Sequence, residues 1–199
     1  MYRLVALGGV RVQGGLLRRM FDLHHRKPDR WSYETSTYDR ERFAAVLRAI
    51  GPGRHKRVLE VGCSEGVFTR ALASDDRVGT VTAADVSPRA LATARRRCEG
   101  LSNVSFVTGS VVNAAPPGPF DLIVCSEMLY YVGGRRRLLA HELAGRLALG
   151  GTLVLEHPYP ESGRLHAAFI HSAGLEIQER TVVPHGVRPF EVLMLRRPE

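Results

Sequence analysis

An acidic residue stands before two spaced glycines in the segment 60–66, which reads Glu-Val-Gly-Cys-Ser-Glu-Gly. Gly62 permits a sharp backbone turn with no side chain in the way of a ligand, and Gly66 permits close packing where a helix starts. Asp85 follows 19 residues after Gly66, at the end of the next apolar run. A carboxylate in this place can accept hydrogen bonds from both hydroxyls of a ribose. The two features together predict a site for a nucleoside-containing ligand.

The spacing within this segment indicates which ligand it suits. A dinucleotide site uses G-x-G-x-x-G to bring backbone amides against a pyrophosphate. This chain instead has Glu60-x-Gly62-x-x-x-Gly66. The Glu60 carboxylate would repel a pyrophosphate, but it suits the amino group of a sulfonium amino acid. The pattern therefore disfavours a nicotinamide-dependent oxidoreductase.

The elements that must hold these residues alternate regularly along the chain. Short β-branched runs alternate with runs of helical periodicity; the former lie at 57–61, 78–85, 104–108, 120–125 and 152–156, and the latter at 66–74, 87–98, 135–148 and 163–173. This alternation predicts parallel strands joined by crossover helices, with the ligand beyond the carboxyl ends of the strands.

The last two strand-like runs, 175–183 and 192–195, are separated by a turn rich in proline and glycine that leaves no room for a helix. They predict an antiparallel hairpin. The expected fold class is α/β, with a Rossmann-like, doubly wound, mostly parallel sheet of seven strands that ends in this C-terminal hairpin.

Two helical stretches are predicted ahead of the sheet. Residues 16–21 form a short amphipathic turn or helix, and Pro28 closes that segment. A longer helix is predicted over 38–50, where Phe43, Val46 and Ile50 recur at helical spacing before a glycine-proline-glycine stop.

Composition limits the class of protein. The chain has 199 residues, of which 44% are hydrophobic and 24% charged, as in an ordinary one-domain globular protein. Its longest apolar stretches fall far short of the about 20 residues that a membrane-spanning helix needs. Arg11 interrupts the apolar start and no small-residue cleavage site follows, so we expect a cytoplasmic protein without a secretory signal.

Charge and metal-ligand residues give weaker signals. The formal net charge is +8, and arginine supplies 26 of the 28 basic residues. The densest runs, Arg95–Arg97 and Arg135–Arg137, fall within amphipathic helical stretches and are interpreted as solvated helix faces. Three widely spaced cysteines predict reduced thiols. His24 and His25 lack further ligands at metal spacing, so we expect a solvated segment and no metal.

The motif that begins at Glu60 resembles the first motif of the class I S-adenosylmethionine-dependent methyltransferases, an acid followed by G-x-G-x-G, with Ser64 in place of the middle glycine. Three segments, 29–38, 59–66 and 126–131, look more narrowly like the nodulation protein S family, whose members N-methylate an amino sugar. The resemblance implies transfer of a methyl group from S-adenosylmethionine to a nitrogen or oxygen of a small molecule, an amino sugar or a secondary-metabolite intermediate, with S-adenosylhomocysteine as product.

The resemblance also implies an N-terminal helical lid at 1–50 and a methyltransferase domain at 51–199, within one structural domain. Trp31 and Tyr33, with Tyr38, would fold over the cofactor, although the same aromatics would equally serve to pack the preceding helix on the sheet. The remaining cofactor contacts are implied by position: Glu60, Gly62, Cys63 and Gly66 at the methionine end, Asp85 at the ribose, Val86, Gly109 and Ser110 at the adenine, and Ser126 near the amino acid portion. Cys63 has no neighbouring base and is interpreted as a small loop residue rather than a nucleophile.

Methyl transfer from a sulfonium is a direct displacement. Positioning lowers such a barrier by about 7–11 kcal/mol, and a general base adds a factor of about 10²–10⁴. The candidate proton acceptors are Glu127, after one strand, and His157, after the next. For both residues a local hydrogen-bonding role is an equal alternative. At His157, the following Pro158 predicts a turn. Tyr131 would shape the acceptor site or donate its hydroxyl, with plain packing as its alternative.

Two other functions remain open on the sequence. A methyltransferase acting on RNA or DNA fits the charge, but a base-modifying amino methyltransferase would be expected to carry a Pro-Pro-aromatic tetrapeptide where residues 126–129 read Ser-Glu-Met-Leu. A non-catalytic module of the same fold would bind the cofactor without turnover. The expected partner is a small-molecule acceptor, with no membrane or nucleic acid, and a homodimer is left open.

Overall fold

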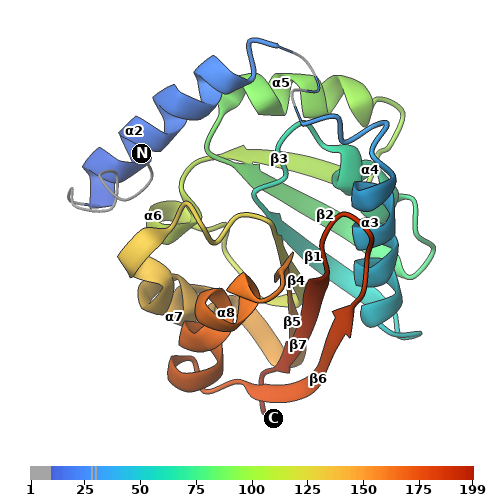
Figure 1. The fold of residues 1–199 in the computed structure, drawn as a ribbon, viewed down its shortest axis with the longest axis vertical. Coiled ribbons are helices and arrows are strands. Elements are labelled where there is room, and N and C mark those ends of the chain that lie inside the picture. The colour runs from blue at the N-terminus through green and yellow to red at the C-terminus, as the bar shows by residue number, and fades with distance from the viewer. Residues whose placement is uncertain (1–9, 28, 30) are drawn as a thin grey trace.

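The structure is a computed structural model that describes residues 10–27, 29 and 31–199 (Figure 1). Residues 1–9 of the apolar start at 1–12 and the closing Pro28 lie outside the described residues. One sheet runs through the molecule in the order β3-β2-β1-β4-β5-β7-β6. Its strands are β1 (His55–Val61), β2 (Val78–Asp85), β3 (Val104–Thr108), β4 (Phe120–Ser126), β5 (Leu147–Pro158), β6 (Glu176–Val183) and β7 (Phe190–Arg196).

The pairing confirms the predicted doubly wound sheet with a C-terminal hairpin. Strands β1 to β5 pair in parallel, and β7 pairs antiparallel with both β5 and β6. The helical elements are α2 (Val10–His24), α3 (Thr37–Ala49), α4 (Val67–Ala73), α5 (Pro88–Arg97), α6 (Val111–Ala114), the 3₁₀ turn η1 (Gly133–Arg135), α7 (Arg136–Arg146) and α8 (Glu161–Ser172).

Side chains of the inner strands alternate between two apolar cores, as the period of a strand dictates. Val58 of β1 packs with α3 and α4 on one face of the sheet, whereas Leu59 packs with α7 and α8 on the other. In β5, Val154 belongs to the first core and Leu155 to the second. Both faces are therefore covered, and a ligand must enter at an edge of the sheet where strands end.

Polar residues fix where helices begin. Ser36 accepts a hydrogen bond from the Asp39 amide at the start of α3, and Ser87 accepts one from the Ala90 amide at the start of α5. Both are side-chain N-caps of the kind that satisfies otherwise unpaired amides. The Ser87 cap matters for the site, because it fixes the chain directly after Asp85.

Gly66 stands before α4 in a left-handed conformation, with φ +77°. A Cβ at this position would lie 2.8 Å from the Cβ of Ala94 and 3.0 Å from its Cα. We expect Gly66→Ala to lower the free energy of unfolding by about 2–4 kcal/mol, because left-handed strain and overpacking against α5 add together. Urea denaturation measures this. Gly53→Ala, which meets open space, is the matched control, and an unchanged midpoint for Gly66→Ala would contradict the close packing.

Three elements differ from the sequence prediction. Helix α2 extends well beyond the amphipathic run at 16–21, and the short helix α6 lies between the predicted strands 104–108 and 120–125, where no helix was predicted. Strand β5 starts at Leu147, inside the stretch predicted as helix, and the register between β4 and β5 shifts near Phe120. Gly151 allows that shift, since a Cβ there would meet the Phe120 carbonyl oxygen at 3.0 Å. Within the described ranges, no helix is long and apolar enough to cross a membrane.

Candidate active site

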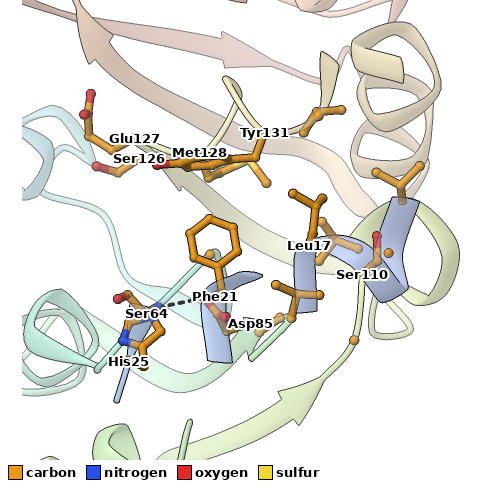
Figure 2. Close-up of a pocket in the computed structure, with 18 of the residues that line it drawn as sticks. Leu17, Phe21, His25, Ser64, Asp85, Ser110, Ser126, Glu127, Met128 and Tyr131 are labelled. Carbon is orange, nitrogen blue, oxygen red and sulfur yellow. Dashed lines mark hydrogen bonds between the residues drawn. The ribbon is translucent and has the colours of Figure 1, made fainter. Parts of the chain in front are cut away.

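A pocket of about 920 Å³ opens at the carboxyl edge of the parallel strands. Its wall comes from the turn after β1, the end of β2, the turn after β3, the loop after β4, and α2, which lies across this edge (Figure 1). Figure 2 shows Leu17 and Phe21 of α2 between the end of β2 at Asp85 and the loop that carries Met128 and Tyr131.

Asp85 lies at the floor of this pocket, as predicted. Its two carboxylate oxygens accept hydrogen bonds from the backbone amides of Ser64 (2.9 Å) and Ser87 (2.8 Å). Burial raises the pKa of Asp85. Each carboxylate oxygen keeps lone-pair capacity beyond one amide bond, so the side chain can also accept from vicinal hydroxyls.

Val86, Gly109 and Ser110 line the same pocket beside Asp85, and Ser126 lines its opposite side. Gly62 has φ +78°, and a Cβ there would come within 3.0 Å of the Met128 Cβ. A side chain at position 62 would therefore close the passage between the turn after β1 and the loop after β4.

A second hollow of about 410 Å³ adjoins the first and shares Tyr33, Gly62, Ser64, Ser126 and Glu127 with it. Glu60 and Cys63 line this second hollow rather than the first. Burial raises the pKa of Glu60 to about 7, with the Asp85 charge adding to the effect. One Glu60 oxygen, Oε2, is buried and has no hydrogen-bond partner within the described residues. A cationic amine of a ligand would provide the hydrogen-bond donor that this buried carboxylate oxygen lacks.

Arg42 of α3 faces the same hollow and was not singled out from the sequence. The side chain is 2% exposed and binds the carboxylates of Glu156 and Asp39 and the hydroxyl of Ser126 (3.3 Å). Its Nε is buried without a partner among the described residues, which leaves one donor for an anionic group. The signal available in the sequence was helical spacing, since Arg42 lies four residues before buried Val46 on the inner face of α3.

Two of the three predicted lid aromatics, Trp31 and Tyr33, line the main pocket. Trp31 and Tyr33 stack on each other with ring centroids 5.9 Å apart. His25 also lines it, and it is 6% exposed with Nδ1 3.0 Å from the Glu65 carboxylate. The prediction that His25 lies in a solvated segment was therefore wrong, because a partner 40 residues away buries it. Tyr38 lines neither hollow and instead packs on Phe190.

The acceptor loop, residues 127–131, follows β4. Glu127 holds a positive φ of 53° and lines both hollows, and its carboxylate accepts from the Tyr130 hydroxyl (3.2 Å) and lies 3.3 Å from Arg188. Burial raises the pKa of Glu127 and the Glu156 charge raises it further, whereas the charges of Arg42 and Arg188 oppose the rise. In Figure 2 the Glu127 carboxylate points away from Phe21 and Asp85. Tyr131 lines the main pocket, edge-on to Phe21 at 4.8 Å.

Besides Tyr38, two predicted site residues are not brought to either hollow. His157 is fully buried beneath the acceptor loop, where its Nε2 lies 3.1 Å from the Leu129 amide, and burial holds its pKa well below the ordinary value. A ring enclosed in this way cannot reach an acceptor, so the assignment of His157 as general base is corrected. Gly66 serves helix packing rather than ligand contact.

The described part of the chain supports neither a nucleophilic cysteine nor a metal site. Burial raises the pKa of the Cys63 thiol well above its usual value, which keeps the thiol protonated and a poor nucleophile. Among residues 10–27, 29 and 31–199, no three histidine, cysteine or acidic side chains gather as a metal site. The arginine runs are only partly solvated, since Arg97 binds Glu34 and the Glu65 carbonyl and Arg135 lines the main pocket.

The strand order and the pocket at the carboxyl edge define the fold of the class I S-adenosylmethionine-dependent methyltransferases. The solved structure of the N-methyltransferase NodS from Bradyrhizobium japonicum WM9, in complex with S-adenosyl-L-homocysteine, matches 92% of this chain and 98% of that chain, with a TM-score of 0.80 and 25% identity. The pattern of the family described as Nodulation protein S (NodS) matches residues 12–176. The chain belongs to the nodulation protein S family, which confirms the resemblance inferred from the sequence.

Two curated relatives carry the same description. The nodulation protein S of Sinorhizobium fredii is 34% identical over 140 residues, which cover 67% of this chain and 64% of that protein. The nodulation protein S of Rhizobium tropici is 36% identical over 129 residues, covering 63% and 53% respectively. The match thus spans between half and two thirds of the length of these relatives.

Proposed function

We propose that this chain is an N-methyltransferase that moves a methyl group from S-adenosylmethionine to the amine nitrogen of a small molecule, with amino sugars as the first acceptor class to test. The observation that carries the proposal is the pair of joined hollows whose polar atoms match the two ends of that cofactor. The relative from B. japonicum is itself described as an N-methyltransferase in complex with S-adenosylhomocysteine.

In this proposal the nucleoside end lies in the main pocket. Asp85 accepts from the ribose hydroxyls, and Val86, Gly109 and Ser110 contact the adenine. The amino acid end lies in the second hollow, where Glu60 Oε2 receives the ammonium group and Arg42 Nε donates to the carboxylate. Both atoms are buried and have no hydrogen-bond partner among the described residues, so a zwitterion at this point satisfies a donor and an acceptor together.

The cofactor supplies an electrophilic methyl group on its sulfonium, and the protein must place a neutral amine in line with it. Glu127 is the side chain we assign to hold and accept the proton of the amine, because it lines both hollows and its raised pKa suits proton transfer near neutral pH. Glu60 and Glu127 together disfavour a phosphate-bearing acceptor at this site. We further infer that α2, Trp31 and Tyr33 act as the lid over the bound cofactor.

The first test is a titration with S-adenosylmethionine and S-adenosylhomocysteine. Trp31 is the single tryptophan of the chain and lines the pocket, so its fluorescence reports occupancy. We expect wild-type protein to bind both ligands and Asp85→Ala to weaken binding by tenfold or more, about 1.4 kcal/mol. Asp76→Ala, at an exposed position in the turn before β2, is the matched control. Absence of binding to either ligand by the wild-type protein would end the proposal.

Turnover is tested by release of S-adenosylhomocysteine with amino sugars and, for comparison, phenols as acceptors. A methylated amine as product supports the proposal. Cofactor binding without any methylated product would favour a non-catalytic module, and a methylated phenol would assign oxygen rather than nitrogen as the nucleophile.

The affinity for S-adenosylhomocysteine is expected to rise with pH. Glu60 is protonated below its raised pKa of about 7, and the ligand ammonium favours the ionised form. Ligand binding therefore releases a proton at low pH, and affinity increases by about tenfold between pH 5.5 and 7.5 before levelling off. Isothermal titration in buffers of different ionisation enthalpy measures how many protons are released when the ligand binds. Glu60→Gln should remove the pH dependence, and an identical dependence in that variant would show that another group causes it.

A further inference from the structure

Three buried polar side chains lie in a row beneath the acceptor loop, and the proposed reaction uses none of them directly. His157 of β5, His166 of α8 and Glu191 of β7 are each 0% exposed. His157 Nδ1 lies 3.0 Å from His166 Nε2, and His166 Nδ1 lies 3.0 Å from Glu191 Oε1. The far end of the row is the Leu129 amide, 3.1 Å from His157 Nε2. We refer to these three side chains as the buried relay.

The hydrogen bonds fix every proton in the buried relay. A backbone amide can only donate, so Nε2 of His157 must accept from Leu129 and carries no proton. Its Nδ1 therefore carries the proton and donates to Nε2 of His166. That leaves the His166 proton on Nδ1, where it is donated to Glu191. Both rings are then uncharged, and each ring nitrogen has one partner.

The carboxylate end of the row is held from two further elements. Ser162 of α8 donates to Glu191 Oε2 at 3.1 Å, and Arg180 of β6 donates to the same oxygen at 3.0 Å. Glu191 also stands opposite His157 in the β5–β7 register. Burial alone would raise the pKa of Glu191, but the hydrogen bonds from His166 and Arg180 hold it below its ordinary value. The row therefore ends on a fixed, ionised anchor.

The other end of the row acts on the acceptor loop. The ladder between β4 and β5 continues one residue past β4, where the Glu127 amide donates to the Glu156 carbonyl at 3.0 Å. Two residues further along the loop, the Leu129 amide donates to a side chain, His157 Nε2, instead of to a strand carbonyl. The His157 ring also meets the Tyr130 ring edge-on at 5.5 Å. The loop that carries Glu127 and Tyr131 is thus held to β5 by two backbone amides, those of Glu127 and Leu129.

We infer that His157, His166 and Glu191 are positioning residues that hold the acceptor loop against the bound cofactor through the Leu129 amide, with both histidines as uncharged Nδ1–H tautomers. The role given to the loop in cofactor and acceptor binding rests on the proposed function. The hydrogen bonds and tautomers of the buried relay do not depend on it, so the proposed function and the relay can each be wrong without the other.

The tautomers are read from long-range ¹⁵N spectra of the wild-type protein, which distinguish protonated from unprotonated ring nitrogens. We expect unprotonated Nε2 and protonated Nδ1 on both rings, assigned to His157 and His166 by through-bond correlation with the backbone. A proton on Nε2 of either ring overturns the inference. This measurement needs neither a ligand nor a destabilising variant, so it decides the point even if a substitution prevents folding.

The contact between His157 and the Leu129 amide is tested by amide hydrogen exchange and by titration with S-adenosylhomocysteine. In His157→Leu, which keeps side-chain volume but no acceptor, the Leu129 amide should exchange at least tenfold faster relative to the amides of β2, and affinity should fall about fivefold. His157→Gln, which restores an acceptor oxygen, should bring affinity back to within twofold of wild type. His171→Leu, an exposed position on α8, is the matched control.

Equal Leu129 exchange in wild type and His157→Leu, or equal loss of affinity in the leucine and glutamine variants, would show that the ring only fills space. If the wild-type protein binds no S-adenosylhomocysteine, the proposed function fails, and the exchange and ¹⁵N measurements still decide whether the relay holds the loop.

Discussion

Replacing Arg42 with methionine is expected to lower the free energy of unfolding by about 3–5 kcal/mol, because it leaves the fully buried Glu156 without its cationic partner. The guanidinium also joins α3 to the end of β4 through Ser126 and to β5 through Glu156. Urea or thermal denaturation of the variant measures the loss.

The control is Arg40→Met, at an exposed position on the same helix, where we expect a change within about 0.5 kcal/mol. The double variant Arg42→Met with Glu156→Leu should recover part of the loss, since an apolar pair avoids an unpaired buried charge. A single Arg42→Met variant as stable as wild type would mean that the buried ion pair does not join the elements as described.

Replacing Glu127 with glutamine is expected to lower kcat by about 100-fold or more while leaving the affinity for S-adenosylhomocysteine within about threefold of wild type. The lower limit is the usual contribution of a general base. The experiment compares steady-state turnover with an amine acceptor for wild type, Glu127→Gln and the exposed control Glu99→Gln. Full activity of Glu127→Gln would remove this residue from the proton-accepting role.

The pH dependence of turnover is a second test of the role of Glu127. Turnover should rise as Glu127 ionises, and the pKa of Glu127 is raised by burial and by Glu156 but lowered by Arg42 and Arg188. Removing that positive charge in Arg188→Gln raises the pKa further, so the rising limb of the profile should shift to higher pH with the same acceptor. A shift to lower pH, or no shift, would assign the limb to another group.

The sequence predicted the fold well because its signal is local. The period of each strand and the turn chemistry at 62–66 depend on neighbours a few residues away, and β2 and β3 have the predicted bounds. Asp85 also lies where the strand-end argument puts it, since the carboxyl ends of neighbouring parallel strands share one edge.

The parts of the site that sequence reasoning missed depend on distant partners. Glu156 and His157 are consecutive, so the strand period sends them to opposite faces of the sheet. Glu156 meets Arg42 on the side of α3, whereas His157 meets His166 on the side of α8. Alternation alone cannot tell which face borders the pocket. The burial of His25 has the same cause, because its partner Glu65 belongs to another element.

The direction of β7 sets the orientation in which this protein is best attached to a surface. Phe190 pairs with Pro158 at the pocket edge of the sheet, and Arg196 pairs with Thr152 toward the opposite edge. The chain after β7 therefore emerges on the side away from α2 (Figure 1). A tether attached through the segment that follows Arg196 would present the open pocket to solution, whereas a tether through α2 would press the ligand entrance against the support.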